Sequence, residues 1–524
     1  MSRSFLPVSR RRFLQLAAAA SAGAALPRSV LASGHDVYDD GDREVPTGAV
    51  GDPDCVIVIG AGFAGLAAAN ALANAGVEVV VLEARHRLGG RAWTVDLDGT
   101  PADMGCSWIH SPIGNPMTQW ANQLGVSSLP AAFEQQAASI LGYDAVAGAR
   151  IGVQDVLVAF FQTTVFEADL ERLRDVLGPR ATAEDALQRF LLDQGVTGDA
   201  ARRQTRAIRA SYELGFAGAM NDISIDALFE GPDAPYAGAD VFPEGGYGRL
   251  VDGLGKGLDV RLGHRVTRVE HGPHGVSVHV RVKKGRRRRY RVMRGSHVIV
   301  TLPLGVLKDR RVVFDPFLPI TKTRSIQRLG VGFLEKVILG FERPFWRDRG
   351  NTHFFYGSKE PGEFPIFFDL QQFVGRPALM GFAGGAFGRS MSQMSRRRIR
   401  RRALEILGEA YPEVPRPRAV RITRWFKDPL SRGSYSFLPV GATYRDLEEL
   451  GQPVGGRLLF AGEATHPAQA STADGAFSTG IREAKRLLGQ PSVRLRPLSD
   501  GRFHSTSAPG LLERIALGRT RRVA

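Results

Sequence analysis

The chain has 524 residues, enough for roughly two to four domains, and its 43% hydrophobic and 23% charged residues are typical of a globular protein with a sizeable core. Two cysteines, Cys55 and Cys106, are too few for a disulfide framework, so we expect two buried free thiols. The net charge of +16 comes mainly from arginine, but the basic runs 283–289 and 396–402 lack interleaved aromatic residues, so we expect solvated surfaces and no nucleic-acid partner.

The N-terminus has the pattern of an export signal. Ser9-Arg10-Arg11-Arg12-Phe13-Leu14-Gln15 precedes an alanine-rich apolar stretch that is too short to span a bilayer. The paired arginines indicate the twin-arginine route, whose substrates leave the cell already folded. We therefore predict a signal peptide over 1–32, a polar leader over 33–52, and a periplasmic, cell-envelope or extracellular protein without a stable membrane span.

A nucleotide-binding unit follows the leader. Residues 55–59 form a short apolar, β-branched run that predicts a buried strand, and Gly60-Ala-Gly62-Phe-Ala-Gly65 comes directly after it. An alanine-rich helix then extends to Gly76, and a second apolar strand over 77–82 ends at Glu83. This order of strand, glycine motif, helix, strand and acid is typical of a dinucleotide-binding fold.

Each residue of this motif has a physical role. Gly60 makes the tight turn, Gly62 lets the backbone approach a pyrophosphate, and Gly65 lets the helix pack on the strand. The helix N-terminus adds unpaired N–H groups and a positive dipole end. Glu83 can accept hydrogen bonds from ribose hydroxyls. Because no second unit of this kind occurs, we expect a single dinucleotide, FAD, and no nicotinamide partner.

Basic residues and glycines continue the predicted cofactor site beyond Glu83. Arg85 follows the second strand, and Gly89-Gly90-Arg91 comes a few residues later. Gly90 lets the chain wrap the same pyrophosphate and Arg91 can neutralise it. We find no residue cluster that predicts a metal site.

The rest of the chain alternates helical and strand patterns, which predicts an α/β protein. Between 111 and 235 the pattern is mostly helical, with helices over 182–194 and 201–212. Further expected elements are strands over 258–262, 266–269, 297–302, 331–341 and 457–460, alternating valines over 276–282, and helices over 395–409 and 474–488. Lys336 interrupts the apolar strand 331–341, and a buried ammonium is costly unless it has a partner and a purpose.

These elements predict a Rossmann-like FAD-binding domain with an inserted α+β substrate-binding domain. The FAD-binding domain is written in three pieces, 53–110, 236–318 and 420–492. The substrate-binding domain occupies 111–235 and 319–419. A basic tail over 493–524 completes the chain.

The sequence resembles the flavin-containing amine oxidases, a family that holds polyamine oxidases, monoamine oxidases and lysine-specific histone demethylases. The resemblance covers about 53–490. It is carried by Gly60-Ala-Gly62-Phe-Ala-Gly65, Glu83-Ala-Arg85, Gly89-Gly-Arg91, Gly105-Cys-Ser-Trp-Ile-His110, Gly114-Asn-Pro116, the segment 298–307, Glu335-Lys-Val337, Pro344-Phe-Trp346, Arg424-Trp425, the segment 428–435, Phe460-Ala-Gly-Glu463 and Gly475-Ala476.

The resemblance implies roles around the substrate. Lys336 matches the lysine that holds a water against flavin N5, and Tyr435 matches one wall of an aromatic cage for the amine. His110 matches a histidine at the substrate mouth of animal polyamine oxidases. Thr472 stands where monoamine oxidases carry a second cage tyrosine. The resemblance therefore argues against a monoamine substrate. The segment 467–470 lacks the tyrosines that polyamine oxidases often carry there, so the amine stays open.

The resemblance also implies cofactor contacts. Trp425 would lie against the flavin, Glu463 would bind the ribityl chain or ribose, and Val266 would contact the adenine through its backbone. Ser434 stands in place of the flavin-linking cysteine, so the FAD should be non-covalent. The helix starting near 474 would point its N-terminus at the flavin. The remaining expected contacts are Ser107, Trp108, Thr472 and Ala473.

The implied activity is hydride transfer from the α-carbon of an amine to flavin, followed by imine hydrolysis and reoxidation by O2 with release of hydrogen peroxide. Three alternatives remain open. An L-amino-acid oxidase would need a cation for the substrate carboxylate, where this chain has Cys106-Ser-Trp108. A carotenoid-type desaturase would need a wide apolar tunnel. A non-catalytic FAD-binding protein would not need Lys336.

Overall fold

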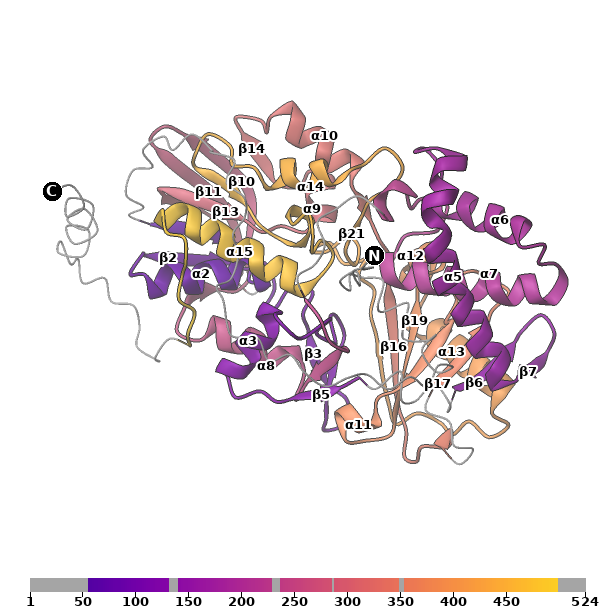
Figure 1. Ribbon diagram of the computed structural model, residues 1–524. Helices are drawn as coiled ribbons and strands as arrows, with labels where there is room; N and C mark the ends of the chain where they lie inside the picture. The colour runs from indigo at the N-terminus through magenta and orange to yellow at the C-terminus, as the bar shows by residue number, and fades with distance from the viewer. Residues whose placement is uncertain (1–54, 132–139, 229–235, 285–286, 348–352, 498–524) are drawn as a thin grey trace, which may run out of the picture.

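The computed structural model describes residues 55–131, 140–228, 236–284, 287–347 and 353–497, so the predicted signal peptide, the leader and most of the predicted tail lie outside the described residues. Figure 1 shows two lobes side by side: one holds the first and last described helices, and the other holds the helices and strands of residues 140–216 and 335–422. No helix in these ranges is both long and apolar enough to cross a bilayer.

A parallel five-stranded sheet forms the centre of the first lobe. Its order is β22-β13-β1-β2-β9, with β1 at Val56–Ile59, β2 at Val79–Leu82, β9 at Asp259–Arg261, β13 at His297–Val300 and β22 at Leu458–Phe460. All four residues of β1 are buried, as a continuous apolar run in a parallel sheet requires. The Rossmann-like prediction is confirmed by this sheet, and its strands come from three distant parts of the chain.

Two helices from opposite ends of the chain pack against each other beside this sheet (Figure 1). They are α2 at Phe63–Asn74 and α15 at Ala473–Leu488. Gly480 of α15 makes the approach possible, because a Cβ there would lie 2.1 Å from the carbonyl oxygen of Ala64. The five residues 493–497 continue along α2, where the backbone carbonyl of Arg496 accepts a hydrogen bond from Asn70 Nδ2.

A second sheet covers the other face of the parallel sheet. Its order is β12-β11-β10-β14, with β10 at His264–Gly272, β11 at Gly275–Lys284, β12 at Arg287–Gly295 and β14 at Val313–Asp315. The alternating valines of β11 are buried in one cluster with Ile57 and Val298, as their period of two predicts.

The second lobe is built on a seven-stranded mixed sheet in the order β20-β16-β19-β18-β17-β6-β7. Its strands are β6 at Ile140–Asp144, β7 at Ala149–Ile151, β16 at Glu335–Gly340, β17 at His353–Gly357, β18 at Ile366–Asp369, β19 at Ala378–Ala383 and β20 at Ala419–Ile422. Its helices are α5 at Val153–Leu177, α6 at Ala183–Asp193, α7 at Gly198–Phe216, α12 at Gly385–Gln393 and α13 at Arg396–Ala410.

Short elements connect the lobes and cover their edges. The helices are α3 at Pro116–Gln123, α8 at Tyr247–Gly255, α9 at Leu304–Lys308, α10 at Ile320–Arg328, α11 at Gln371–Val374 and α14 at Tyr444–Gly451. The strands are β3 at Thr94–Asp96, β4 at Pro101–Asp103, β5 at Ser128–Pro130, β8 at Val241–Pro243, β15 at Gly330–Val331 and β21 at Ser436–Phe437.

The prediction of one continuous strand over 331–341 is wrong, because this segment forms two separate strands. The chain first pairs as β15 with β21 and then, after three residues, pairs as β16 with β19. Gly332 lies at this change of sheet, where a Cβ would be 2.6 Å from the Cβ of Ala217. The apolar pattern could not reveal the break because both halves are apolar.

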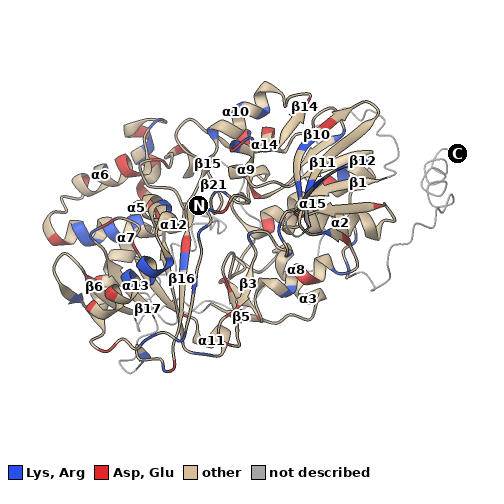
Figure 2. Cartoon of the chain, turned by 180° about the vertical axis from the view of Figure 1, so that it is seen from behind, with Lys and Arg blue, Asp and Glu red and all other residues tan. Residues whose placement is uncertain are grey.

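Two further expectations need adjustment. Cys55 and Cys106 are not joined in a disulfide, as expected, but both are half-buried rather than buried. The strands β6 and β7 lie in the segment expected to be mostly helical. The basic run 396–402 does form a largely solvated helix face, since five of its arginines are exposed (Figure 2).

Candidate cofactor and substrate site

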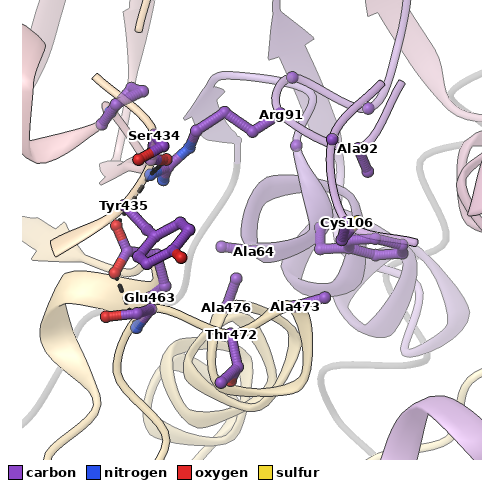
Figure 3. Close-up of a pocket in the computed structure, with 18 of the residues that line it drawn as sticks. Ala64, Arg91, Ala92, Cys106, Ser434, Tyr435, Glu463, Thr472, Ala473 and Ala476 are labelled. Carbon is purple, nitrogen blue, oxygen red and sulfur yellow. Dashed lines mark hydrogen bonds and ion pairs between the residues drawn. The ribbon is translucent and has the colours of Figure 1, made fainter. Parts of the chain in front are cut away.

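One cavity of about 340 Å³ brings together the predicted site residues. It runs between the β1–α2 turn, the segment 104–111, the end of α7, and the segment 462–476 (Figure 3). Every residue for which a catalytic or cofactor contact was predicted lines this cavity except Gly65, which packs behind it. Their individual roles stay predictions.

The glycine turn has the geometry that its sequence predicts. Gly60 has a φ of +105°, which favours glycine. A Cβ on Gly65 would lie 1.9 Å from the carbonyl oxygen of Gly60, so helix α2 can meet β1 only through glycine. A Cβ on Gly62 would have no protein atom closer than 3.9 Å, which leaves the space in front of this backbone for a pyrophosphate.

Glu83 is buried at the far end of this turn. Its Oε2 accepts a hydrogen bond from Ala61 N at 2.8 Å, and its Oε1 accepts one from Arg85 N at 2.6 Å. These bonds fix the carboxylate beside the turn, as a ribose-binding acid requires. The Arg85 guanidinium pairs with Asp428 at 2.7 Å.

Arg91 and Glu463 join the two ends of the site across the cavity (Figure 3). Arg91 Nη1 donates to Glu463 Oε1 at 2.9 Å and to the Ser434 carbonyl at 2.8 Å. Glu463 Oε2 accepts from Ser436 Oγ at 2.6 Å and from Ser471 N at 2.9 Å. Burial alone would raise the pKa of the Glu463 carboxyl, but Arg91 and the Ser436 bonds outweigh it and lower that pKa.

We expect Glu463→Gln to lower the free energy of unfolding at pH 7 by about 3 kcal/mol, because it breaks a buried ion pair. Asp428→Asn removes a carboxylate whose side chain is 25% exposed, against 5% for Glu463, and should cost only about 1 kcal/mol. Since the folded pKa of Glu463 is lowered, its stabilisation is present above the usual glutamate pKa and is lost at lower pH. Thermal and urea unfolding at pH 7 and pH 4 measure this; equal stability of wild type and Glu463→Gln at pH 7 would contradict it.

The N-terminus of α15 opens onto the cavity (Figure 3). Thr472 is its N-cap: Oγ1 accepts from Gly475 N at 3.0 Å and donates to the Gln469 carbonyl at 2.7 Å. This leaves the first N–H groups and the positive end of the helix dipole beside Ala473. Gln469 is buried and lines the cavity, and its Nε2 has no acceptor among the described residues, which fits a ligand that supplies one.

Lys336 is buried in the cavity wall and does not reach solvent. Its Nζ donates to Ser107 Oγ at 2.6 Å and to the Gly105 carbonyl at 2.5 Å, and it lies 5.5 Å from the ring centroid of Phe382. Burial lowers the pKa of Lys336 to about 8, and nearby Asp103 opposes that shift. The site therefore holds an ammonium that costs free energy to keep charged.

Aromatic side chains line the same part of the cavity. The Tyr435 hydroxyl donates to the Leu214 carbonyl at 2.7 Å, which fixes the ring against the end of α7. Trp425 is buried edge-to-face against Trp93. Trp108 packs on Phe382 with its ring. These rings form an apolar enclosure suited to the carbon chain of a small substrate.

The remaining predicted contacts lie at the two ends of the cavity. Val266 is buried on β10 at the end where Glu83 lies, next to an irregularity in the strand pairing. His110 is half-exposed, and its Nδ1 lies 2.8 Å from Asp240 Oδ2. Asp240, Gln469 and Leu214 line the cavity but were missed. No motif marks Asp240 or Leu214, and the segment 467–470 was considered only for the tyrosines that it lacks.

We expect the FAD to be released intact when the protein is denatured in acid or urea. Ser434 carries no thiol, and its Oγ accepts a hydrogen bond from Leu334 N at 3.0 Å. Separation of the denatured protein from small molecules, followed by absorbance spectra of both fractions, measures this. Flavin absorbance that stays with the polypeptide would refute it.

Comparison with known proteins agrees with the site. Residues 63–488 match the family described as flavin containing amine oxidoreductase. Lysine-specific histone demethylase 1 homolog 2 of Oryza sativa subsp. japonica is 34% identical over 455 residues, which are 84% of this chain and 58% of that protein. Protein FLOWERING LOCUS D of Arabidopsis thaliana is 34% identical over 456 residues, 84% of this chain and 56% of that protein. The chain thus matches less than two thirds of the length of either relative.

Solved structures share the fold. Putrescine oxidase with bound putrescine superposes with a TM-score of 0.65 at 22% identity, covering 83% of this chain and 99% of that one. A double mutant of putrescine oxidase gives 0.65 at 23% identity, with 84% and 99% covered. The family match, the glycine turn and the cavity lead to one conclusion: this chain belongs to the flavin-containing amine oxidoreductase family, with FAD as its cofactor.

Proposed function

We propose that the protein is an amine oxidase that takes hydride from the α-carbon of an amine and passes the electrons to O2, which yields an imine and hydrogen peroxide. FAD supplies the hydride acceptor and the electron donor to oxygen. The observation that carries the proposal is the buried ammonium of Lys336 in the same cavity as the Tyr435 ring. An electron carrier or a structural flavoprotein has no need of such a costly group.

The residues around the substrate have separable tasks in this proposal. Tyr435, held by its bond to Leu214, and Phe382 enclose the carbon chain of the amine. Lys336 holds a water and a positive charge where oxygen is reduced. The enclosing rings exclude solvent, and water hydrolyses the imine to an aldehyde and a smaller amine after release.

The relatives suggest two substrate classes. Putrescine oxidase is named for a diamine, and the relative from Oryza sativa subsp. japonica is named as a lysine-specific histone demethylase homolog. We infer a small free amine for this chain, because the rings of Trp108, Phe382 and Tyr435 enclose the part of the cavity around Lys336.

The test is a peroxide-coupled assay of the purified flavoprotein. The panel holds putrescine, spermidine, spermine, N-acetylspermine, benzylamine, a dimethyl-lysine peptide and the common L-amino acids. Turnover of one or more small amines supports the proposal. Turnover of amino acids alone would make the protein an L-amino-acid oxidase, and anaerobic mixing with no flavin bleaching by any compound would overturn amine oxidation altogether.

We also propose that the protein is exported through the twin-arginine pathway, on the basis of Arg10-Arg11 ahead of Phe13-Leu14. The double substitution Arg10→Lys with Arg11→Lys should abolish export and leave flavin-loaded protein inside the cell. Fractionation with an immunoblot and flavin fluorescence measures this. Undiminished export of the variant would show that another route is used.

A further inference from the structure

The ammonium of Lys336 binds only uncharged acceptors among the described residues. Its Nζ donates to the Gly105 carbonyl at 2.5 Å, to Ser107 Oγ at 2.6 Å and, more weakly, to the Asp103 carbonyl at 3.4 Å. Every residue of its strand, β16, is buried. Because a buried ammonium without a counter-charge is strongly unfavourable, a negative charge has to lie near the 103–107 turn.

Asp103, the first residue of this turn, carries a buried carboxylate that is surrounded by donors. Thr94 Oγ1 donates to Asp103 Oδ1 at 2.5 Å, and Tyr247 N lies 3.2 Å from both carboxylate oxygens. Thr94 Oγ1 also accepts from Gly248 N at 2.7 Å, which leaves its own proton for Asp103. Since Tyr247 is the first residue of α8, the positive end of that helix dipole also favours the charged form of the carboxyl group.

Two glycines allow this arrangement. Gly246 has a φ of +83°, and a Cβ there would lie 2.9 Å from Asp103 Oδ1. A Cβ on Gly105 would lie 1.5 Å from the Arg91 carbonyl, so the turn can reach its position only with glycine there. The backbone of Asp103 therefore contacts the lysine, while its carboxylate is fixed at the start of α8.

The other titratable groups near the ammonium supply no negative charge at neutral pH. Burial raises the pKa of the Cys106 thiol and of the Tyr247 hydroxyl, so both stay protonated. Glu335 precedes the lysine in β16, and its side chain points to the opposite face of the sheet. The neighbours of the lysine on the adjoining chain segments, Phe382 and Thr423, are uncharged.

We propose that Asp103 is a positioning residue for Lys336, and that its carboxylate is the counter-charge that keeps the ammonium charged while O2 is reduced. The inference rests on the proposed reduction of O2. Asp103 does not line the cavity, so it acts on the reaction only through the lysine. The lysine meets the cavity, and the acid behind it determines over which pH range the lysine carries a charge.

The pair has a limited pH range in which both groups are charged. Burial raises the pKa of Asp103 to about 6 and lowers the pKa of Lys336 to about 8. The carboxylate and the ammonium therefore coexist between these values. Without the carboxylate, the ammonium loses a favourable interaction and should release its proton at lower pH.

The experiment measures reoxidation of the reduced holoenzyme by O2 in stopped flow between pH 5 and pH 9. The flavin is reduced anaerobically with a stoichiometric amount of dithionite, so the result does not depend on the amine that the enzyme accepts. In Asp103→Asn, the fall in rate that we expect for wild type near pH 8 should move to lower pH by about one unit or more. Below about pH 6 the two rates should agree within about twofold, because the carboxyl group of wild type is then neutral too.

Stability gives a readout that does not depend on oxidase activity. Asp103→Asn should lower the urea midpoint at pH 7, because it leaves the ammonium without its counter-charge. In a Lys336→Met background the same substitution should cause no loss or a gain, since the carboxylate then balances no charge. Thr94→Val is a milder second variant: it keeps the carboxyl group but removes one donor, so the pH profile should shift in the same direction by less.

Asp446→Asn is the matched control. This carboxylate is also buried, and it binds Ser325 Oγ and Thr443 N at the start of α14, away from the cavity. Its loss should lower stability and leave the pH profile of reoxidation unchanged.

The outcomes are distinct. A pH profile that does not move in flavin-loaded Asp103→Asn, or a rate that falls equally at every pH, would overturn the role of Asp103 as the counter-charge. Equal losses of stability with and without Lys336 would do the same. Wild-type enzyme whose reduced flavin reacts with O2 no faster than free flavin would instead overturn the proposed oxidase function, and that result is visible before any variant is made.

Discussion

Lys336→Met is expected to slow the reoxidation of the reduced enzyme by O2 by about 10²- to 10³-fold, while FAD stays bound. A fixed cation stabilises the superoxide-like charge that forms first, and losing one preorganised charge typically costs that much. Methionine fills a similar volume in the buried strand β16, so the fold should survive. Reduction by the amine under anaerobic conditions should change less, because hydride transfer develops less charge at this point.

The pKa of Lys336 adds a second measurable effect. Since burial lowers that pKa to about 8, the ammonium is charged below this pH and neutral above it. Reoxidation by wild-type enzyme should therefore fall as the pH rises through about 8, and the variant should lack this fall.

Lys322→Met is the matched control for this experiment. Lys322 is also buried, but its Nζ binds the Glu449 and Leu450 carbonyls at the end of α14, and it does not line the cavity. Its loss should lower stability and leave reoxidation unchanged. Unchanged reoxidation in Lys336→Met with FAD still bound would mean that Lys336 only ties the 103–107 turn to β16.

The second large effect concerns the glycine motif. Substitution of Gly65 should lower stability, whereas substitution of Gly62 should weaken FAD binding. Gly65→Ala places a methyl group 1.9 Å from the Gly60 carbonyl, in contact with rigid backbone. We expect unfolding to become easier by about 3 kcal/mol or more, whether or not FAD is present.

Gly62→Ala should leave the protein fold nearly unchanged, since the added methyl group meets no protein atom within 3.9 Å. The methyl group would instead occupy the approach to the pyrophosphate and weaken FAD binding by at least about tenfold. Thermal melts of the apoproteins and FAD titrations measure the two effects separately. A stable apoprotein for Gly65→Ala, or unchanged FAD affinity for Gly62→Ala, would contradict this division of roles.

The parts of the fold that the sequence predicted are those with local signals. The run 55–59, the glycines after it and Glu83 each carry their own physical requirement, so the turn, both strands and α2 followed directly. The alternation of valines in β11 predicted which face of that strand is buried. Lys336 was identifiable because a lysine, next to Glu335, stood in an otherwise apolar segment.

The missed features depend on residues that are distant in sequence. Asp240 matters because Val241 pairs with Ile109, and nothing near residue 240 indicates that partner. The break between β15 and β16 depends on two different partner strands, β21 and β19. Gln469 can be recognised as a site residue only from the structure, in which it lines the cavity beside the start of α15.

The packing of α2 against α15 determines when, during synthesis of the chain, the FAD site can be completed. A ribosome adds about 5–20 residues per second, so more than roughly 20 s separates the synthesis of Phe63–Asn74 from that of Ala473–Leu488. Until then the glycine turn faces an unfinished site without Glu463 or the opposing helix end. We therefore expect the complete FAD site to form only after α15 has been translated. Under the export route proposed above, loading would then have to finish inside the cell, and bound flavin would mark a chain that has been assembled before departure.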